Sequence, residues 1–533
     1  MKKITIFSLA LVLLAMTGAC REEYLQTEPT ETISNPNAQF KLNGLYNLMV
    51  NTGTGGTDLD HDDFGQKGYD IYMDLLSSDM VLGGTTYGWY SNIANYSDPV
   101  DYTRNTNYKP WRYYYRLIYA ANDVISGLGG NEAVLGNAED KAAMGQAKTI
   151  RAHAYYNLMQ LYTPKYDPSA LSIPVYTLGS AEGGTKVPQS EVYDLMINDL
   201  TESVTLLEGY ARPNKGVINQ NVARGILAYV YAAKGDYPKV VETAGTLVNT
   251  GGVPVTTKAQ ATGGFNDLNT SSWMWGFDLT LDNDLDLVSW WGQVDIFSYS
   301  YAWAGDPKAI DENLYNGARA DDIRKTQFVS IVEFNPKTSI LLDENGAPVI
   351  VNGEKVLSIT KFPKGYTIES AFFDPETNPN DHYQVSAGDI TFSAVPANKF
   401  FDPGKVIGGQ RVIQTDYLYM RIDEFHLLYA EALAKTGQAA AAKTVYKNFL
   451  SNRLTNTDYV DGLSDASLVD DIYFNTRLEF WGEGKAYAAL KRNQATVTRG
   501  ANHLFFVGQS FNYDDNRLYL KIPQQEVVSN PNL

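Results

Sequence analysis

The sequence predicts a mainly α-helical fold, in which a tetratricopeptide-like helical scaffold carries loop-rich insertions and small β elements. Apolar residues recur three and four positions apart in several long segments, a spacing that places them on one face of an α-helix. Two of these segments also repeat one pattern of small and large residues, which indicates a helical repeat. From about Gly251 to Thr415 this spacing fades, and glycine, proline, asparagine, aspartate and aromatic residues dominate. We therefore expect helices before and after an irregular middle.

The N-terminus predicts a lipoprotein leader. Lys2 and Lys3 precede an apolar stretch, Ile4–Met16, which has the length of a signal-peptide core. This stretch is too short to span a bilayer core of roughly 30 Å as a helix. The small residues Thr17, Gly18 and Ala19 follow, and then Cys20, the only cysteine in the chain. We expect residues 1–19 to be removed, Cys20 to be lipidated and to anchor the protein in a membrane, and residues 20–37 to form a tether. A plain secretory leader with an incidental cysteine is the alternative.

Three segments between residues 111 and 207 have the spacing of amphipathic helices. The first is Trp111–Leu128, and the second ends at Tyr162, where Pro164 stops it. The third is Ser190–Leu207, for which Ser190 is the expected N-cap.

Two later segments, far apart in the sequence, align with each other residue for residue. The first contains Leu227, Ala228, Tyr231, Gly235, Tyr237, Val240, Ala244 and Leu247. The second contains Tyr429, Ala430, Leu433, Gly437, Ala439, Ala442, Tyr446 and Phe449. Small residues let two antiparallel helices approach, glycine serves the turn, and the larger residues fill the seam, as in tetratricopeptide units. We expect a single domain over residues 38–533, with a helical scaffold at 38–250 and 416–500 and a loop-rich binding excursion at 251–415.

Aromatic residues in two loops are the candidate ligand-binding residues. Flat rings stack on the C–H face of a sugar, while carboxylates and amides pair with its hydroxyls, and loops on a rigid scaffold commonly carry binding sites. The candidates in the first loop are Tyr87, Trp89 and Tyr90, and those in the second are Trp290, Trp291, Tyr299, Tyr301 and Trp303, with Asp295, Asp306 and Lys308 nearby.

An extended segment would place the alternating residues Tyr299, Tyr301 and Trp303 on one face. Our hypothesis is that Trp89, Tyr299 and Trp303 help to form an exposed aromatic arc. The alternative is that the alternating residues Tyr299, Tyr301 and Trp303 are buried in the core, where indoles usually lie. We expect Trp273 and Trp275 to pack beneath the first repeat unit.

The sequence favours no catalytic or metal chemistry. It contains no HExxH, G-x-S-x-G or P-loop motif, so we expect no enzymatic activity and no cofactor. A formal net charge of −18 makes nucleic acid a poor partner, because phosphates would be repelled. Asp58, Asp60 and Asp62 alternate as in a calcium loop, but the glycine is displaced from the EF-hand position. A solvated acidic loop is the main interpretation, and a structural calcium site stays open, as does a hydrolase built on paired carboxylates.

Five segments in order resemble the SusD/RagB family of outer-membrane lipoproteins. They begin with Trp111-Arg112, Arg151-Ala152, Arg421-Ile422-Asp423-Glu424, Arg477 with Glu483-Gly484, and Ile522-Pro523. The resemblance implies a helical scaffold with tetratricopeptide-like units and a protein at the cell exterior that captures glycans. It also implies a partner, a SusC-like TonB-dependent transporter in the outer membrane. Capture of peptides or glycopeptides, as in RagB-like members, is the alternative; a glycoside hydrolase or a protein-binding scaffold is a weaker one.

The charged and indole side chains of these motifs lie on apolar helix patterns. We therefore expect structural ion pairs from the charged residues Arg151, Arg421, Glu431, Arg477 and Glu483. We expect Trp111 and Trp481 to be core residues.

Overall fold

The computed structural model describes residues 37–58, 60–178, 183–302, 304–334, 350–351, 354–355, 367–368, 390–407 and 410–533. The leader, Cys20 and Trp303 lie outside these residues. Helices dominate, as the sequence predicts, and the strands are short and paired two by two. Among the described residues, no helix combines the length and the apolar character needed to cross a membrane.

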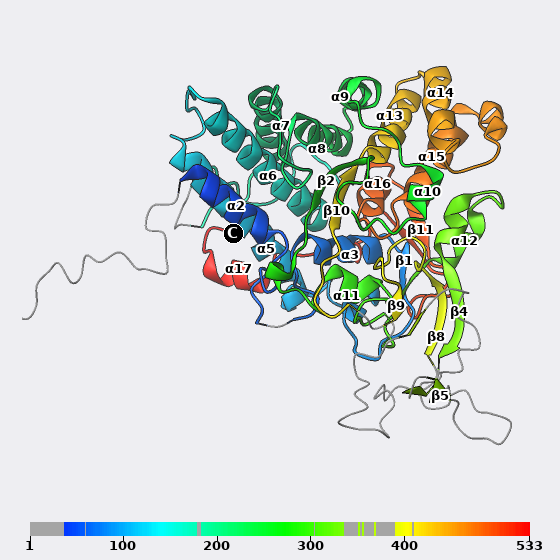
Figure 1. The fold of residues 1–533 in the computed structure, drawn as a ribbon. Helices are drawn as coiled ribbons and strands as arrows, with labels where there is room; N and C mark the ends of the chain where they lie inside the picture. The colour runs from blue at the N-terminus through cyan, green and yellow to red at the C-terminus, as the bar shows by residue number, and fades with distance from the viewer. Residues whose placement is uncertain are drawn as a thin grey trace, which may run out of the picture.

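Long helices form the scaffold, which extends along the top of the molecule in the view of Figure 1. Its first part comprises α2 Ala38–Leu48, α5 Asn105–Gly127, α6 Ala138–Tyr162, α7 Gln189–Leu206, α8 Gln220–Lys234 and α9 Tyr237–Thr250. Its second part comprises α13 Asp423–Lys435, α14 Ala439–Leu450, α15 Asp465–Glu479 and α16 Ala486–Arg492. From α5 to α9 each helix packs on the next, and α13 continues the series against α9. The excursion in the sequence therefore does not interrupt the stack in space.

The two predicted repeat units are confirmed as helical hairpins, α8–α9 and α13–α14. Gly235 and Gly437 follow the first helix of each unit with φ of 81° and 77°, the left-handed conformation that ends a helix and that glycine adopts most readily. Between the units, a β-carbon added to Gly245 of α9 would lie 3.0 Å from the ring of Tyr429 of α13. Gly245, which is not part of the predicted pattern, thus allows the close approach of the two units.

Asparagine caps begin several scaffold helices. The side chains of Asn37, Asn137 and Asn219 accept hydrogen bonds from the third residue of α2, α6 and α8, respectively. The expected cap at Ser190 is wrong: α7 begins one residue earlier, at Gln189, after Pro188. Proline pre-sets a backbone angle that suits the start of a helix, so the side-chain cap is not needed there.

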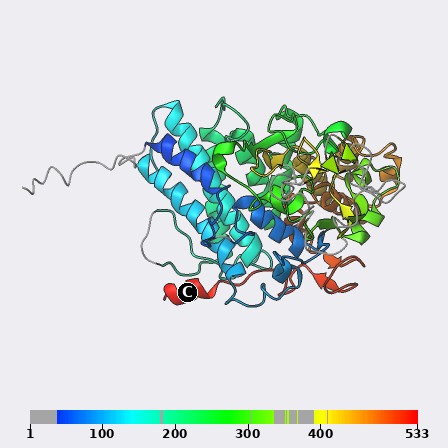
Figure 2. The same ribbon diagram turned by 60° about the horizontal axis from the view of Figure 1, so that its bottom comes forward.

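Short elements beneath the scaffold come from residues 66–94, from the excursion and from the C-terminal part. Strand pairs are β1 Met80–Leu82 with β3 Lys308–Ile310, β2 Trp273–Phe277 with β10 Tyr417–Arg421, β4 Val329–Phe334 with β8 Ile390–Val395, β5 Ile350–Val351 with β6 Glu354–Lys355, β7 Thr367–Ile368 with β9 Val406–Ile407, and β11 Thr496–Thr498 with β12 Ser510–Asn512. Short helices are α3 Gln66–Leu76, α4 Ser91–Ala94, α10 Lys258–Ala261, α11 Trp290–Val294, α12 Glu312–Gly317, α17 Gln524–Ser529 and the 3-10 turns Leu281–Asn283, Ile323–Gln327 and Asp458–Gly462. Figure 2 shows α17, which contacts α5, at the margin of the helical scaffold.

Buried indoles and ion pairs hold these parts on the scaffold. Trp273 and Trp275 of β2 are buried as predicted, and so are Trp111 and Trp481. The motif charges form the ion pairs that the sequence predicts. These pairs are Arg151–Asp199 at 2.7 Å, Arg477–Asp79 at 2.5 Å, Arg492–Glu431 at 2.9 Å and Arg421–Glu483 at 2.8 Å.

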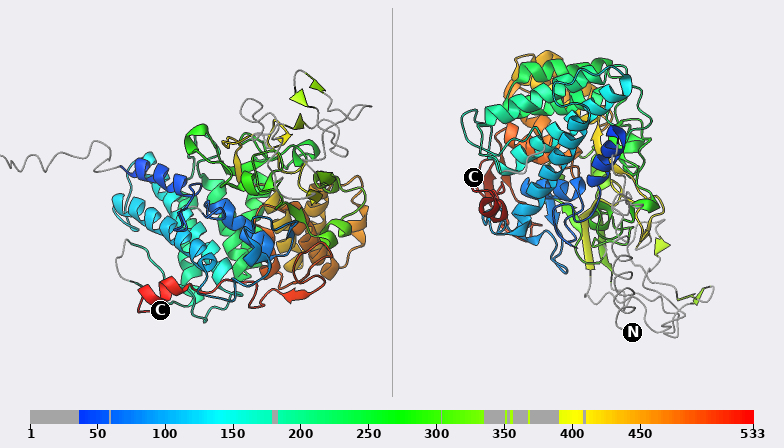
Figure 3. Two further views of the ribbon diagram at one scale, coloured as in Figure 1. Left: turned by 90° about the horizontal axis from the view of Figure 1, so that it is seen from below. Right: turned by 90° about the vertical axis from the view of Figure 1, so that its left-hand side faces the viewer.

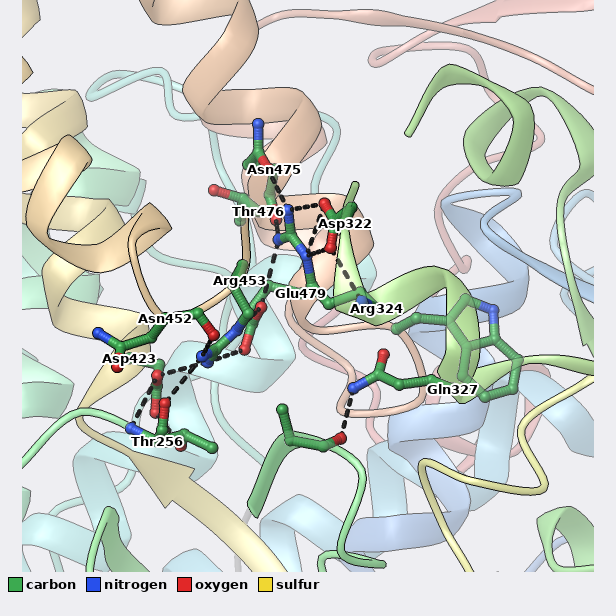
Figure 4. Close-up of polar contacts among 12 residues, drawn as sticks. Thr256, Asp322, Arg324, Gln327, Asp423, Asn452, Arg453, Asn475, Thr476 and Glu479 are labelled. Carbon is green, nitrogen blue, oxygen red and sulfur yellow. Dashed lines mark hydrogen bonds and ion pairs between the residues drawn. The ribbon is translucent and has the colours of Figure 1, made fainter. Parts of the chain in front are cut away.

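One carboxylate joins three regions of the chain. Glu479 of α15 pairs with Arg453 after α14 at 2.7 Å and with Arg324 of the excursion at 3.2 Å, as Figure 4 shows. It also pairs with Arg421 of β10 at 2.7 Å. All of these side chains are at least 98% buried. A buried carboxylate that loses its partners is strongly destabilising, so this network fixes where the excursion sits.

Candidate ligand-binding site

Two loops far apart in the sequence meet at one end of the β1–β3 ladder. Leu82 pairs with Lys308 there, and the Gly83 N–H donates to the Pro307 carbonyl at 2.7 Å. Residues 83–90, which follow β1, and residues 299–307, which precede β3, therefore leave the ladder at the same edge. The left view of Figure 3 shows the molecule from below. The ladder brings together both loops that the sequence nominated.

Asp306 fastens one loop to the other. Its carboxylate accepts hydrogen bonds from the backbone N–H groups of Tyr87 at 3.0 Å and Gly88 at 3.1 Å. The Thr86 hydroxyl donates in return to the Gly305 carbonyl at 3.3 Å. Hydrogen bonds to a carboxylate are stronger than neutral ones, so Asp306 sets the position of the residues on either side of Gly88.

Four rings form a group that we call the aromatic row: Tyr87, Tyr301, His61 and Trp89. Tyr87 packs edge-on against Tyr301 with ring centroids 5.0 Å apart, and Trp89 stacks on His61, also at 5.0 Å. His61 Nδ1 is hydrogen-bonded to the Tyr301 hydroxyl and links the two pairs. Tyr87 is 55% exposed and Trp89 is half-buried, whereas Tyr301 is 5% exposed. The row therefore presents Tyr87 and Trp89 to solvent and supports them with Tyr301 and His61.

Burial changes the titration of the supporting rings. It raises the pKa of the Tyr301 phenol to about 12 and lowers the pKa of His61 below its ordinary value, against the pull of Asp286 and Asp62. At neutral pH the row therefore consists of uncharged rings, and these suit stacking on an uncharged apolar surface.

A pocket of about 220 Å³ opens beside the row. It is lined by Asp62, Tyr87, Gly88, Trp89, Tyr90, Asn92, Ile93, Asp98, Thr106 and Lys109. One wall is aromatic and the remainder is largely polar, with carboxylate, amide, hydroxyl and ammonium groups. That combination matches a sugar ring, whose faces are apolar and whose edge carries hydroxyls.

The acidic run next to the row is paired with a lysine. Lys109 of α5 lies 2.7 Å from an Asp60 carboxylate oxygen and 2.6 Å from one of Asp62, and Asp62 also accepts a hydrogen bond from the Tyr72 hydroxyl at 3.0 Å. Although burial opposes it, these two carboxylates raise the pKa of Lys109. Asp58 is exposed. Within the described part of the chain, no group of three or more histidine, cysteine, aspartate or glutamate residues could hold a metal ion.

Several candidate aromatics are core residues, which corrects their nomination as surface contacts. Tyr90 is 4% exposed and packs edge-on against Tyr72. Trp290 and Trp291 are 2% and 1% exposed, because they begin helix α11 at the Ser289 cap and pack against each other. At these three positions the rings gain more from hydrophobic burial than from exposure to solvent.

The segment with alternating aromatics is a turn and not an extended strand. The Tyr301 N–H donates to the Gly292 carbonyl at 2.7 Å, and the Asp306 N–H donates to the Tyr301 carbonyl at 2.8 Å. Tyr301 therefore points inward to support the row, and Tyr299 is half-buried beside Arg411 with the guanidinium 4.5 Å from its ring. Trp303 lies outside the described residues, so the arc with Trp89 and Tyr299 stays a hypothesis.

Sequence reasoning missed three members of the site. His61 lies in an acidic run that suggested only a solvated or calcium-binding loop, and nothing in its spacing links it to Trp89. Lys109 belongs to a helix in which its charge carries no signal of burial. Asp306 was noted beside the candidate aromatics, but its role in holding Tyr87 and Gly88 follows only from the fold.

Comparisons with known proteins agree with this architecture. A model of the SusD family matches residues 312–533, and a model described as starch-binding associating with outer membrane matches residues 67–232, which include Tyr87 and Trp89. SusD-like protein P2 of Formosa agariphila is 23% identical over 435 residues, which cover 79% of this chain and 78% of that protein. SusD-like protein P25 of the same organism is 26% identical over 205 residues, 37% of each chain.

Solved structures share the fold over nearly the whole chain. A SusD-like carbohydrate binding protein from Bacteroides vulgatus has a TM-score of 0.71 at 24% identity, with 93% of this chain and 96% of that chain covered. Surface glycan-binding protein A from Bacteroides uniformis has a TM-score of 0.61 at 18% identity, with 93% and 98% covered.

Proposed function

This chain belongs to the SusD/RagB family, and from that premise we propose that it is a surface lipoprotein that captures oligosaccharide or polysaccharide without catalysis. The captured glycan would pass to a SusC-like TonB-dependent transporter in the outer membrane. Cys20 would carry the lipid anchor, and the protein would face the cell exterior. Association with the outer membrane is the part that the description of the second family model supports.

The aromatic row is the observation that supports glycan binding. Tyr87 and Trp89 offer ring surface to solvent, and before any ligand arrives Asp306 holds the backbone of Tyr87 while His61 stacks on Trp89. A binding surface that is already ordered loses little conformational entropy when a ligand binds. The adjacent pocket supplies polar partners for hydroxyls.

The open character of the site favours glycans over peptides. An extended peptide is commonly recognised through its main chain, in a closed cavity or along a free strand edge. Here Tyr87 and the half-buried Trp89 present an open surface of rings and not a closed cavity. Peptide capture is therefore the weaker alternative.

A glycan array with the protein lacking residues 1–20 tests this function. We expect binding to a restricted set of glycans and no new reducing ends after prolonged incubation with those glycans. Binding to no glycan on the array, together with binding to a peptide library, would replace glycan capture with peptide capture. The appearance of new reducing ends would contradict the proposed absence of catalysis.

A further inference from the structure

The charges around the pocket are dominated by carboxylates. Asp62 and Asp98 line it, Asp60 lies next to Asp62 on the same lysine, and Asp306 holds the loop above it. Lys109 is the one cation among the residues that line the pocket. His61 adds no positive charge at neutral pH, because burial lowers its pKa.

The cations near the pocket are already engaged by acceptors of the protein. Lys109 Nζ lies between Asp60 and Asp62 at 2.7 and 2.6 Å. Lys308 is fully buried and donates to the Gln293 side chain at 2.7 Å and to the Asp306 carbonyl at 3.2 Å.

Arg104 is a further cation, next to the pocket residue Asp98. Its side chain is 56% exposed and lies 3.2 Å from Asp101 and 3.7 Å from Asp98. An anionic ligand would therefore have to compete with a protein acceptor for each of these three cations.

Asp98 offers an acceptor that lacks a donor. Its side chain is 2% exposed, and one oxygen, Oδ2, accepts a hydrogen bond from the Thr106 hydroxyl at 2.5 Å. The other oxygen, Oδ1, is buried without a hydrogen-bond donor among the described residues, and its nearest ion-pair contact is Arg104 at 3.7 Å. A buried oxygen without a donor is unfavourable, and a ligand hydroxyl would satisfy it.

We propose that this pocket selects uncharged sugar units and rejects sugars that carry a carboxylate or a sulfate ester. The proposal rests on the proposed function, because it names the substrate class of the same site. A sugar hydroxyl can donate a hydrogen bond to Asp98 Oδ1. A carboxylate or sulfate ester brings only acceptor oxygens, and these cannot satisfy an oxygen that itself needs a donor. Placing like charges next to each other across an interface is strongly unfavourable.

Matched pairs of ligands test the selectivity. The mature protein is titrated with sulfated carrageenan oligosaccharides before and after desulfation, and with polygalacturonate oligosaccharides before and after chemical reduction of their carboxylates. The array described above supplies further neutral and acidic pairs. We expect the neutral member of each binding pair to bind at least about tenfold more tightly, with an affinity that changes little between about 0.02 M and about 0.5 M salt, because screening acts on charged partners.

Asp98→Asn provides the site-specific test, with Asp123→Asn as the matched control. Asp123 is an exposed carboxylate on the same helix as Lys109 and pairs with Lys41, so its substitution removes one negative charge without touching the pocket. We expect Asp98→Asn to reduce the ratio of the affinities for neutral and acidic ligands by about threefold or more. Asp123→Asn should leave this ratio unchanged. Thermal melts establish that both variants are folded.

The outcomes separate the two proposals. Binding of acidic glycans as tightly as their neutral counterparts would overturn the selectivity while glycan capture stands. An equal reduction of the affinity ratio by Asp98→Asn and Asp123→Asn would also overturn it, because the effect would then come from net charge and not from the pocket. Binding to no glycan of either kind would remove glycan capture itself and the selectivity with it.

Discussion

The indole of Trp89 lies flat on the imidazole of His61, with the ring planes only 9° apart and the centroids 5.0 Å apart. His61 therefore covers one face of the indole and fixes its plane. Trp89 is half-buried, so part of its side chain remains exposed to solvent. The ring that we propose as a sugar platform is thus held by a neighbour and does not rotate freely.

His61→Ala removes that support. We expect the affinity for the array-selected glycan to fall by about three- to tenfold, because the indole loses the neighbour that orders it. His61→Phe keeps a flat ring for stacking but loses the hydrogen bond to Tyr301, so we expect it to retain most of the affinity. Calorimetric titration compares the variants. A wild-type affinity in His61→Ala would show that the stacked ring has no role in binding.

Asp306→Ala frees the loop that carries Tyr87 and Trp89. The backbone N–H groups of Tyr87 and Gly88 lose their common acceptor, so we expect a loss of about 1–3 kcal/mol in unfolding free energy and a weaker affinity for glycan. Asp306→Asn retains one carbonyl oxygen and should lie between the wild type and Asp306→Ala in both quantities. Identical binding by all three proteins would argue against preorganisation of the loop.

Glu479→Gln disrupts the buried network of Figure 4. We expect the free energy of unfolding, measured with urea, to fall by about 3–5 kcal/mol, because Arg324, Arg421 and Arg453 share this carboxylate. Glu242→Gln is the control: this residue pairs with Lys239 on the surface, where such pairs contribute about 0–1 kcal/mol. Equal effects of the two substitutions would contradict the importance of the network.

The same carboxylate predicts a dependence of stability on pH. Burial alone would raise the pKa of Glu479, but Arg453 and Arg421 hold it well below its ordinary value. A depressed pKa stabilises the folded state above the unfolded-state pKa of about 4.3, and this contribution is lost as the pH falls toward the folded-state value. We therefore expect unfolding free energy to fall below about pH 4.3 less steeply in Glu479→Gln than in the wild type. If the unfolding free energies of the two proteins fell in parallel with pH, Glu479 would not be the group responsible.

Alanine substitutions at two glycines without close neighbours test the effect of backbone conformation apart from packing. A β-carbon at Gly235 would meet no atom within 4 Å, but its φ of 81° is unfavourable for alanine. We expect Gly235→Ala to destabilise the protein by about 1–2 kcal/mol. Gly44→Ala, in the exposed interior of α2 and also free of contacts, should stabilise it by about 1 kcal/mol. Thermal melts of both variants check the sign.

The scaffold could be predicted because its signals are local. The matching small residues and the glycines Gly235 and Gly437 predict where the helices of each hairpin approach and where the chain turns. Both hairpins form where expected. The contact of α9 with α13 could not be derived from either segment alone. It depends on the path that residues 251–415 take between the two helices. Ser190 shows the usual limit at helix ends, where a preceding proline competes with a side-chain cap.

The sequence could locate the candidate site, but it could not show which of its aromatic residues are exposed. Tyr87 and Trp89 stand out because aromatic residues there interrupt a loop of small residues, and the structure exposes both, Trp89 in part. Trp290 and Trp291 have the same composition signal but lie in the core, because burial depends on partners such as Phe400 that are distant in sequence. Likewise, His61 joins the row through contacts with residues that are remote along the chain.

Calorimetric titration of Trp89→Ala against the wild type, with the glycan that the array selects, tests the central claim most directly. Phe40→Ala, which removes an exposed ring of α2 far along the chain from both loops, is the control. We predict that Trp89→Ala weakens the affinity at least about tenfold, or about 1.4 kcal/mol, while Phe40→Ala leaves it unchanged. A Trp89→Ala protein that is folded and binds within about twofold of the wild type would contradict glycan capture by the aromatic row.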